Sequence, residues 1–193
     1  MRIVSGSARG RTLKGPRSSA IRPTADRVRE SVFNILGQWL DGQKVLDLFA
    51  GTGALGLEAL SRGAAAAVLV DSDREAVTLC RENARALGFQ DQARVMSSTV
   101  GRALELLVRQ GERFDLVLAD PPYAARAARD TLERVQPLLS PGGTCVVEHD
   151  RREVVPEAVG RLARVDERAF GDTRVSFFRS LDPPERGKDA APS

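Results

Sequence analysis

The stretch VLDLFAGTGALG, residues 45–56, decides the fold of this chain. A short apolar run that contains Asp47 leads directly into the spacing Gly51-x-Gly53-x-x-Gly56. A strand that passes through a glycine turn into a helix is typical of α/β domains that bind a nucleotide or nucleoside cofactor. The glycine spacing alone is a weak signal, because it fits a dinucleotide, another nucleoside cofactor or an inert structural turn.

Around this unit the chain alternates short apolar runs with helical stretches. We expect strands at 44–49, 67–71, 93–97, 114–119 and 144–149, separated by helices at 54–62, 74–88, 99–110 and 126–139. Such alternation predicts an α/β fold with a doubly wound parallel sheet. Two later runs, 163–170 and 173–180, flank Gly171-Asp172 and predict an antiparallel hairpin at one edge of that sheet.

The segment before Lys44 has a different pattern. RIVSG (2–6) and RTLKG (11–15) resemble two short strands, and a helix follows, with Pro23 just outside it and Thr24 as its N-cap. The apolar residues at helical spacing, which we expect to pack on the body, are Val28, Val32, Ile35, Leu36, Trp39 and Leu40. We therefore divide the chain into an N-terminal extension (1–43), a catalytic domain (44–181) and a disordered tail (182–193).

The charge of the chain is unevenly distributed. Residues 1–30 hold eight basic and two acidic side chains, a net charge of +6, which leaves −3 for the rest of a chain whose total is +3. A basic arm on a mildly acidic body indicates a polyanion partner such as nucleic acid, although a solvated charged surface is the simpler alternative. The candidate RNA-binding residues are Arg2, Arg9, Arg11, Lys14, Arg17, Arg22, Arg27 and Arg29.

Composition excludes several classes of protein. With 193 residues, 42% hydrophobic and 28% charged, the chain fits one soluble globular domain. Its two cysteines and single His149 predict neither a disulfide framework nor a metal site. No run is long enough to span a membrane and no signal peptide is evident, so we expect a cytoplasmic protein. Because no feature suggests an obligate dimer, we expect a monomer.

Three carboxylates are expected at one edge of the sheet. Asp47, Asp71 and Asp120 lie at the carboxyl ends of predicted strands, where open parallel sheets bind their ligands. Two acids at this crevice would repel a pyrophosphate, but they suit the sulfonium and ammonium groups of S-adenosyl-L-methionine (SAM). Asp71, which follows Gly51 by 20 positions, suits a ribose diol. We therefore favour SAM over a dinucleotide.

The motif DPPY (120–123) follows the fourth predicted strand. Proline has no N–H and a fixed φ, so the two prolines make a rigid tip with free carbonyls. If the substrate is an exocyclic amine of a flat base, an Asp120 oxygen and the Pro121 carbonyl can accept its two N–H hydrogens, while Tyr123 stacks on the base. The catalytic candidates are Asp120, Pro121, Pro122 and Tyr123. His149, beside Glu148, is a weaker candidate.

DPPY together with VLDLFAGTG resembles the amino-methyltransferases that act on adenine N6, guanine N2 or glutamine N5. RIVSGSARGRTLKGP, IRPTADRVRESVFNIL and FGDTRVSFF narrow the resemblance, over about residues 2–180, to the RsmD-type family of bacterial small-subunit rRNA guanine-N2 methyltransferases. The resemblance implies a seven-stranded Rossmann-like SAM methyltransferase fold. It also implies a guanine of 16S rRNA, naked or within a 30S particle, as the substrate.

The resemblance also implies roles for particular residues. Asp47, Gly51 and Gly53, with Phe49 nearby, would hold the methionine part of SAM, and Asp71 would bind the ribose. Ser72 would lie beside the adenine, as would Ser98 or Thr99, where many methyltransferases have Asp or Asn. Arg22, Thr24, Arg27 and Glu30 would border the cofactor and RNA entrance.

Two other functions remain open on the sequence. DPPY alone does not separate guanine N2 from adenine N6, so an adenine-N6 methyltransferase acting on RNA or DNA is the nearest alternative. A ribosome-assembly factor that binds RNA and keeps a vestigial SAM site is the alternative from another class.

Overall fold

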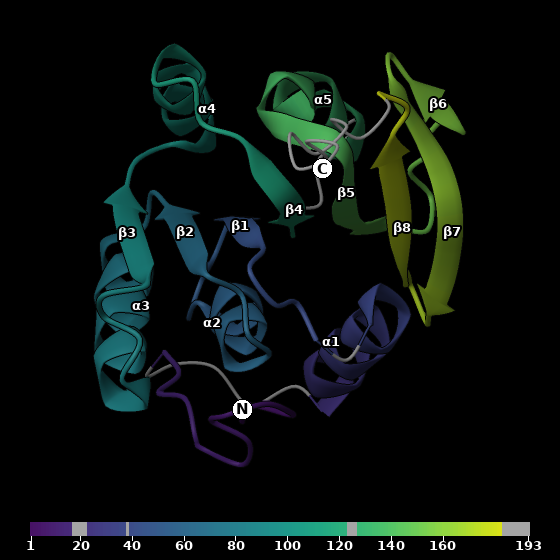
Figure 1. Ribbon diagram of the computed structural model, residues 1–193. Coiled ribbons are helices and arrows are strands. Elements are labelled where there is room, and N and C mark those ends of the chain that lie inside the picture. The colour runs from purple at the N-terminus through teal and green to yellow at the C-terminus, as the bar shows by residue number, and fades with distance from the viewer. Residues whose placement is uncertain (17–22, 38, 123–126, 183–193) are drawn as a thin grey trace, which may run out of the picture.

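The computed structural model describes residues 1–16, 23–37, 39–122 and 127–182, and side chains are described from Arg27 onward in the first helix. The described elements form one sheet with helices on both faces (Figure 1). The strand order is β3-β2-β1-β4-β5-β8-β7-β6. No helix in these residues is long and apolar enough to cross a membrane.

Five parallel strands make the first part of the sheet, and three antiparallel strands extend it. The parallel strands are β1 (Lys44–Leu48), β2 (Ala66–Asp71), β3 (Ala93–Ser97), β4 (Phe114–Ala119) and β5 (Leu139–Asp150). The antiparallel strands are β6 (Ala158–Val159), β7 (Leu162–Phe170) and β8 (Thr173–Ser180). The predicted Rossmann-like sheet and its C-terminal hairpin are confirmed, and the two-residue β6 raises the strand number from the expected seven to eight.

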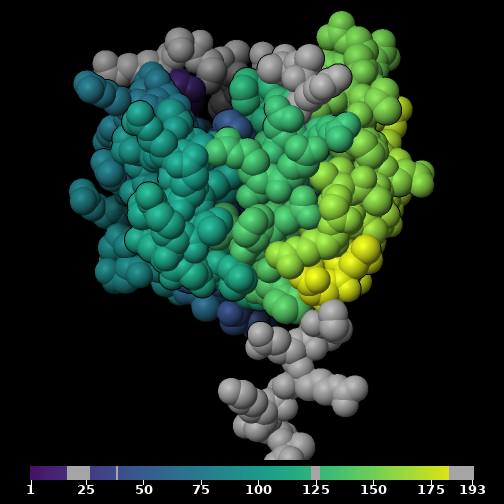
Figure 2. Space-filling model, turned by 90° about the horizontal axis from the view of Figure 1, so that it is seen from above, coloured from purple at the N-terminus to yellow at the C-terminus, as the bar shows by residue number. Residues whose placement is uncertain are grey.

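Helices cover the sheet in two layers. Helices α1 (Pro23–Leu36), α2 (Ala54–Ser61) and α3 (Arg74–Leu87) pack on one face, and α4 (Val100–Arg109) and α5 (Ala127–Val135) pack on the other (Figure 1). In the space-filling view from the side of α4 and α5, these helices and the C-terminal strands form a continuous surface (Figure 2). The sheet is thus buried on both faces, as its apolar strands require.

The region after α5 differs from the prediction. The α-helix ends at Val135 instead of continuing to 139, because Pro137 cannot donate the next helical hydrogen bond. A short 3₁₀ helix η1 (Gln136–Leu138) follows, and β5 begins at Leu139. The register between β4 and β5 shifts near Phe114, and residues 140–143, which lie between the predicted helix and the predicted strand, are part of β5.

The two N-terminal stretches predicted as short strands lie antiparallel but pair only briefly. One bridge in the described residues joins Arg2 to Thr12, and the Ile3 and Leu13 N–H groups donate to the Arg11 and Met1 carbonyls. Ile3, Ala8 and Leu13 are nevertheless buried in the same hydrophobic cluster as helices α1–α3. The segment is therefore anchored mainly by packing and by contacts with α2 and α3.

Helix α1 also departs from the prediction at both ends. It includes Pro23, which suits the first helical position because it has no N–H to satisfy. Val28, Val32 and Leu40 are buried as expected, but Trp39 is 60% exposed. The helix ends at Leu36, so Trp39 no longer follows the helical spacing that would have placed it on the buried face.

The close approach of Gly6 to Ser61, which helps to hold the N-terminal segment against α2, can be tested by substitution. Gly6 has φ +83°, and an added Cβ would lie 1.7 Å from the Ser61 carbonyl oxygen. Gly10 has a similar φ of +79° but open space around it. We expect Gly6→Ala to lower the free energy of unfolding by more than about 2 kcal/mol and Gly10→Ala by about 1–2 kcal/mol, measured by urea denaturation. Equal losses would show that the close approach to Ser61 does not matter.

Candidate functional site

The site lies where the strand order reverses. From β1 the chain builds outward to β2 and β3, and it then returns to the other side of β1 to build β4 and β5. Open α/β sheets bind ligands at the carboxyl ends of the strands beside such a switch point. Here β1 and β4 pair directly, and the Asp120 N–H donates to the Leu48 carbonyl at 3.5 Å. Asp47 and Asp120 thus flank the switch point from neighbouring strands.

A cleft of about 530 Å³ opens at this position, within the usual size range of small-molecule sites. It is bounded by the ends of β1 and β4, the glycine loop, α1 and the N-terminal segment. The described residues that line it are Met1, Pro16, Val28, Arg29, Asp47, Phe49, Ala50, Gly51, Thr52, Ala54, Leu55, Asp120, Pro121, Pro122, Glu148 and Thr173.

Asp47 connects the cleft wall to the start of α2. Its carboxylate is 1% exposed, and Oδ2 accepts a hydrogen bond from the Gly56 N–H at 2.8 Å. A Cβ on Gly56 would lie 2.2 Å from Leu69 Cδ2 and 3.2 Å from this same oxygen. Burial raises the pKa of Asp47 to about 7, with smaller contributions from the charges of Asp120 and Asp71. A cation in the cleft would therefore be favourable for this carboxyl group.

Asp120 faces the same cleft at the end of β4. Desolvation by the cleft walls raises its pKa, even though the residue remains exposed on the cleft side. Pro121 is buried and Pro122 is exposed, and both line the cleft. Tyr123 lies outside the described residues, so its predicted stacking role stays a prediction.

Hydrogen bonds from α3 and β2 hold the glycine loop in position. Asp71 Oδ2 accepts from the Gly51 N–H at 2.8 Å, and the Cys80 thiol donates to the Gly51 carbonyl at 3.3 Å. Burial raises the pKa of Cys80 to about 12, so its thiol stays protonated. Phe49, immediately before the loop, has φ 60°, a left-handed conformation that is uncommon for residues other than glycine and recurs at functional sites.

The residues expected to contact ribose and adenine lie at the same edge of the sheet but do not line the cleft in its described part. Asp71 uses both carboxylate oxygens on backbone N–H groups, those of Gly51 and Asp73. Ser72 is exposed. Ser98 donates its N–H to the Asp71 carbonyl, and the Thr99 hydroxyl caps α4. Their contacts with a cofactor remain predictions.

Most of the described basic residues near the N-terminus have exposed side chains. These are Arg2, Arg9, Arg11, Lys14 and Arg27. Two of these contact α3: Arg11 donates to the Ala86 and Leu87 carbonyls, and Lys14 pairs with Glu82 at 3.1 Å. Two further candidates, Arg17 and Arg22, lie outside the described residues, as does the side chain of Thr24.

The burial of Arg29 does not fit the exposed position that its predicted role in RNA binding requires. Its side chain is only 3% exposed, pairs with Glu58 at 3.7 Å and donates to the Arg2 carbonyl. Glu58 is itself fully buried on α2. An RNA phosphate on the outer surface does not reach a guanidinium that is enclosed in this way. Arg29 does, however, line the cleft.

His149 does not line the described cleft. It is 2% exposed, its Nε2 is 2.9 Å from the Ser176 hydroxyl, and its Nδ1 is 3.1 Å from the Asp150 carbonyl. Both ring nitrogens thus have partners within the sheet, which is a structural role.

Sequence reasoning missed several residues of the site. Glu58 and Asn83 are buried polar groups that link the N-terminal segment to helices α2 and α3. Asn83 also donates to the Thr52 carbonyl of the glycine loop at 2.9 Å. Both lie on helices whose neighbouring residues are apolar core positions, and such a polar residue in a buried stripe was the available signal.

The switch-point cleft, the glycine loop and the acidic strand ends define a Rossmann-like domain that binds a cofactor. A family described as "Conserved hypothetical protein 95" matches residues 1–179, and the chain belongs to this family. The chain is 38% identical over 181 residues to "Putative rRNA methyltransferase YlbH" of Bacillus subtilis, covering 93% of this chain and 98% of that one. It is 40% identical over 136 residues to "Ribosomal RNA small subunit methyltransferase D" of Escherichia coli, covering 70% and 67%.

A solved structure agrees with these relatives. "Putative methyltransferase yhhF from Escherichia coli" superposes with a TM-score of 0.81 at 33% identity, covering 93% of this chain and 97% of that one. The protein is therefore a methyltransferase.

Asp47 should make stability depend on pH. Its pKa is raised from 3.8 to about 7, so the folded protein binds more protons than the unfolded chain between these values, and stability falls as pH rises. Relative to Asp47→Asn, the wild type should lose up to about 1.4 kcal/mol of unfolding free energy per pH unit between pH 4 and 7, and nothing further above pH 7. Urea denaturation of both proteins across this range tests the prediction. Parallel pH profiles would contradict it.

Proposed function

We propose that this methyltransferase transfers a methyl group from S-adenosyl-L-methionine to the exocyclic N2 amine of a guanine in small-subunit (16S) ribosomal RNA. The observation that carries the proposal is the meeting of Asp120-Pro121 with Asp47 across one cleft. The relatives named as rRNA methyltransferases support the RNA substrate. The N2 position of guanine rests on the sequence resemblance to the RsmD-type family.

The residues of the cleft fit this methyl donor. Asp47 and Asp120 both have raised pKa values, so each would be stabilised in its ionised form by a nearby cation. The α-carbon of Gly51 has open space where a Cβ would stand, which lets a ligand approach the loop backbone. When bound, SAM supplies an electrophilic methyl group on a positively charged sulfur.

The protein's own contribution is to orient the amine. A guanine amine is a weak nucleophile, because its nitrogen lone pair is conjugated with the ring. An Asp120 oxygen and the Pro121 carbonyl accept its two N–H groups, fix its orientation and stabilise the positive charge that develops on nitrogen. The fixed backbone of Pro121 and Pro122 keeps these acceptors in place before the base arrives.

The RNA is held by the exposed basic residues of the N-terminal segment. Arg2, Arg9, Arg11 and Lys14 lie on the segment whose first residue, Met1, lines the cleft. A base delivered to Asp120 from a loop or an opened helix would leave its backbone phosphates near this basic surface.

Asp120→Asn tests the catalytic role. The variant should transfer methyl groups about 10²–10³-fold more slowly, because the carboxylate that stabilises the developing charge is lost. Its affinity for S-adenosylhomocysteine should stay within about threefold, a small change in binding free energy. The assay follows labelled SAM with 16S rRNA and with 30S subunits, and then identifies the methylated nucleoside. Asp172→Asn, a change in an exposed acid of the β7–β8 turn, is the matched control.

The outcomes of this assay separate the alternatives. N2-methylguanosine as the product supports the proposal, and N6-methyladenosine would replace it with the adenine enzyme. RNA binding without any methyl transfer would identify an assembly factor. Unchanged turnover in Asp120→Asn would refute the role given to the motif.

The basic segment gives a separate prediction. Replacing Arg2 and Arg9 with Gln should weaken rRNA binding and reduce the slope of log K against log salt by about 0.7–0.9 for each phosphate contact that is lost. Fluorescence anisotropy over a range of salt concentrations measures this slope. Arg113→Gln, an exposed change outside the N-terminal segment, is the control. An unaltered slope would mean that these arginines form only a charged surface.

A further inference from the structure

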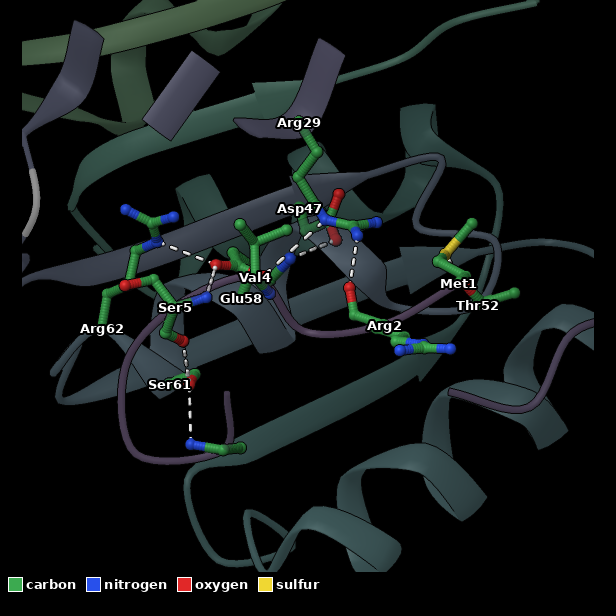
Figure 3. Close-up of polar contacts among 12 residues, drawn as sticks. Met1, Arg2, Val4, Ser5, Arg29, Asp47, Thr52, Glu58, Ser61 and Arg62 are labelled. Atoms are coloured by element: carbon green, nitrogen blue, oxygen red, sulfur yellow. Dashed lines mark hydrogen bonds and ion pairs between the residues drawn. The ribbon is translucent and has the colours of Figure 1, made fainter. Parts of the chain in front are cut away.

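Arg29 is a buried arginine in the wall of the cleft. It comes from α1, and its guanidinium lies against Glu58 and the Arg2 carbonyl (Figure 3). Its side chain is 3% exposed, yet it lines the same cleft as Asp47 and Asp120. Burying a guanidinium is costly unless it is paired, so its place in the wall of a ligand cleft calls for a reason.

Glu58 orients this arginine but is shared with other groups. Its Oε1 accepts from Arg62 Nε at 2.9 Å and from the Ser5 N–H at 2.9 Å. Its Oε2 accepts from the Val4 N–H at 2.7 Å and lies 3.7 Å from Arg29 Nε. The closer ion pair is therefore the one with Arg62, and one carboxylate serves two buried arginines. This arrangement holds Arg29 in place, while the negative charge of Glu58 is shared between the two guanidinium groups.

The charged side chains that line the cleft are mostly acidic. The described lining residues include three acids, Asp47, Asp120 and Glu148, and one base, Arg29. A SAM molecule carries two cationic groups, which the acids suit, and one carboxylate, which they would repel. Arginine is the side chain best suited to a carboxylate, because its planar fork can donate two parallel hydrogen bonds.

We propose that Arg29 recognises the carboxylate of the methionine portion of the cofactor, with Glu58 as the positioning residue that holds the guanidinium at the cleft wall. The inference rests on the SAM site of the proposed function and adds a residue to it. It gives the RPTADRVRE segment a second task beside RNA binding, since Arg27 of the same helix is exposed while Arg29 turns inward.

Paired ligands test this role by binding alone. Isothermal titration calorimetry would compare S-adenosylhomocysteine with its decarboxylated analogue, which differs only by the missing carboxylate. Wild type should bind the decarboxylated analogue about tenfold or more weakly, the usual size of a charged hydrogen-bonded contact. Arg29→Met should weaken S-adenosylhomocysteine binding by a similar factor and leave binding of the analogue within about twofold.

Arg62→Met is the matched control, because Arg62 shares Glu58 and is equally buried but is absent from the described cleft lining. It should change the affinities for both ligands by the same factor. Arg29→Lys keeps a charge at the site and should recover part of the lost discrimination.

The wild-type comparison keeps the inference testable even if the variants fold poorly. Equal wild-type affinity for both ligands would overturn it while leaving the proposed function intact, as would an equal loss for both ligands in a folded Arg29→Met. Failure of the wild type to bind S-adenosylhomocysteine at all would instead refute the proposed SAM site.

Discussion

The hydrogen bond from the Gly56 N–H to the buried Asp47 carboxylate is the contact on which the rest of the site depends. It joins the end of β1 to the first turn of α2 and so fixes the glycine loop between them. Gly56 cannot carry a side chain there, because Leu69 from β2 occupies the space. The same carboxylate borders the cleft, and its burial costs stability that a cationic ligand would recover. The constraint that shapes the loop thus also determines what the cleft prefers to bind.

The N-terminal segment is built into this arrangement by buried side-chain contacts. Glu58 accepts the N–H groups of Val4 and Ser5, and Asn83 bonds both the Lys14 backbone and the Thr52 carbonyl. The N-terminal segment and the glycine loop therefore share a supporting residue, Asn83 on α3. An RNA bound to the N-terminal segment would therefore lie close to the cleft, where we propose that methyl transfer occurs.

Much of this structure follows from local patterns in the sequence. The alternation of strands and helices predicts the parallel part of the sheet. The positions of Asp47 and Asp120 at strand ends predict that they lie at the same edge, because both predictions depend on periodicity and topology alone. The burial of Arg29 could not be predicted, since it depends on Glu58 from a different helix. The two N-terminal stretches pair over only a short length, and the Val4 and Ser5 N–H groups donate to Glu58, a contact between distant segments that the local pattern does not reveal. The prediction that Trp39 is buried was wrong because α1 ends at Leu36, three residues before it.

The most direct test of the account is an experimental structure with sinefungin, a SAM analogue that carries an amine near the position of the transferred methyl group. The account predicts that sinefungin lies in the cleft between β1 and β4, with that amine within hydrogen-bonding distance of Asp120 or the Pro121 carbonyl. Binding elsewhere on the protein, or an amine directed away from Asp120, would contradict it.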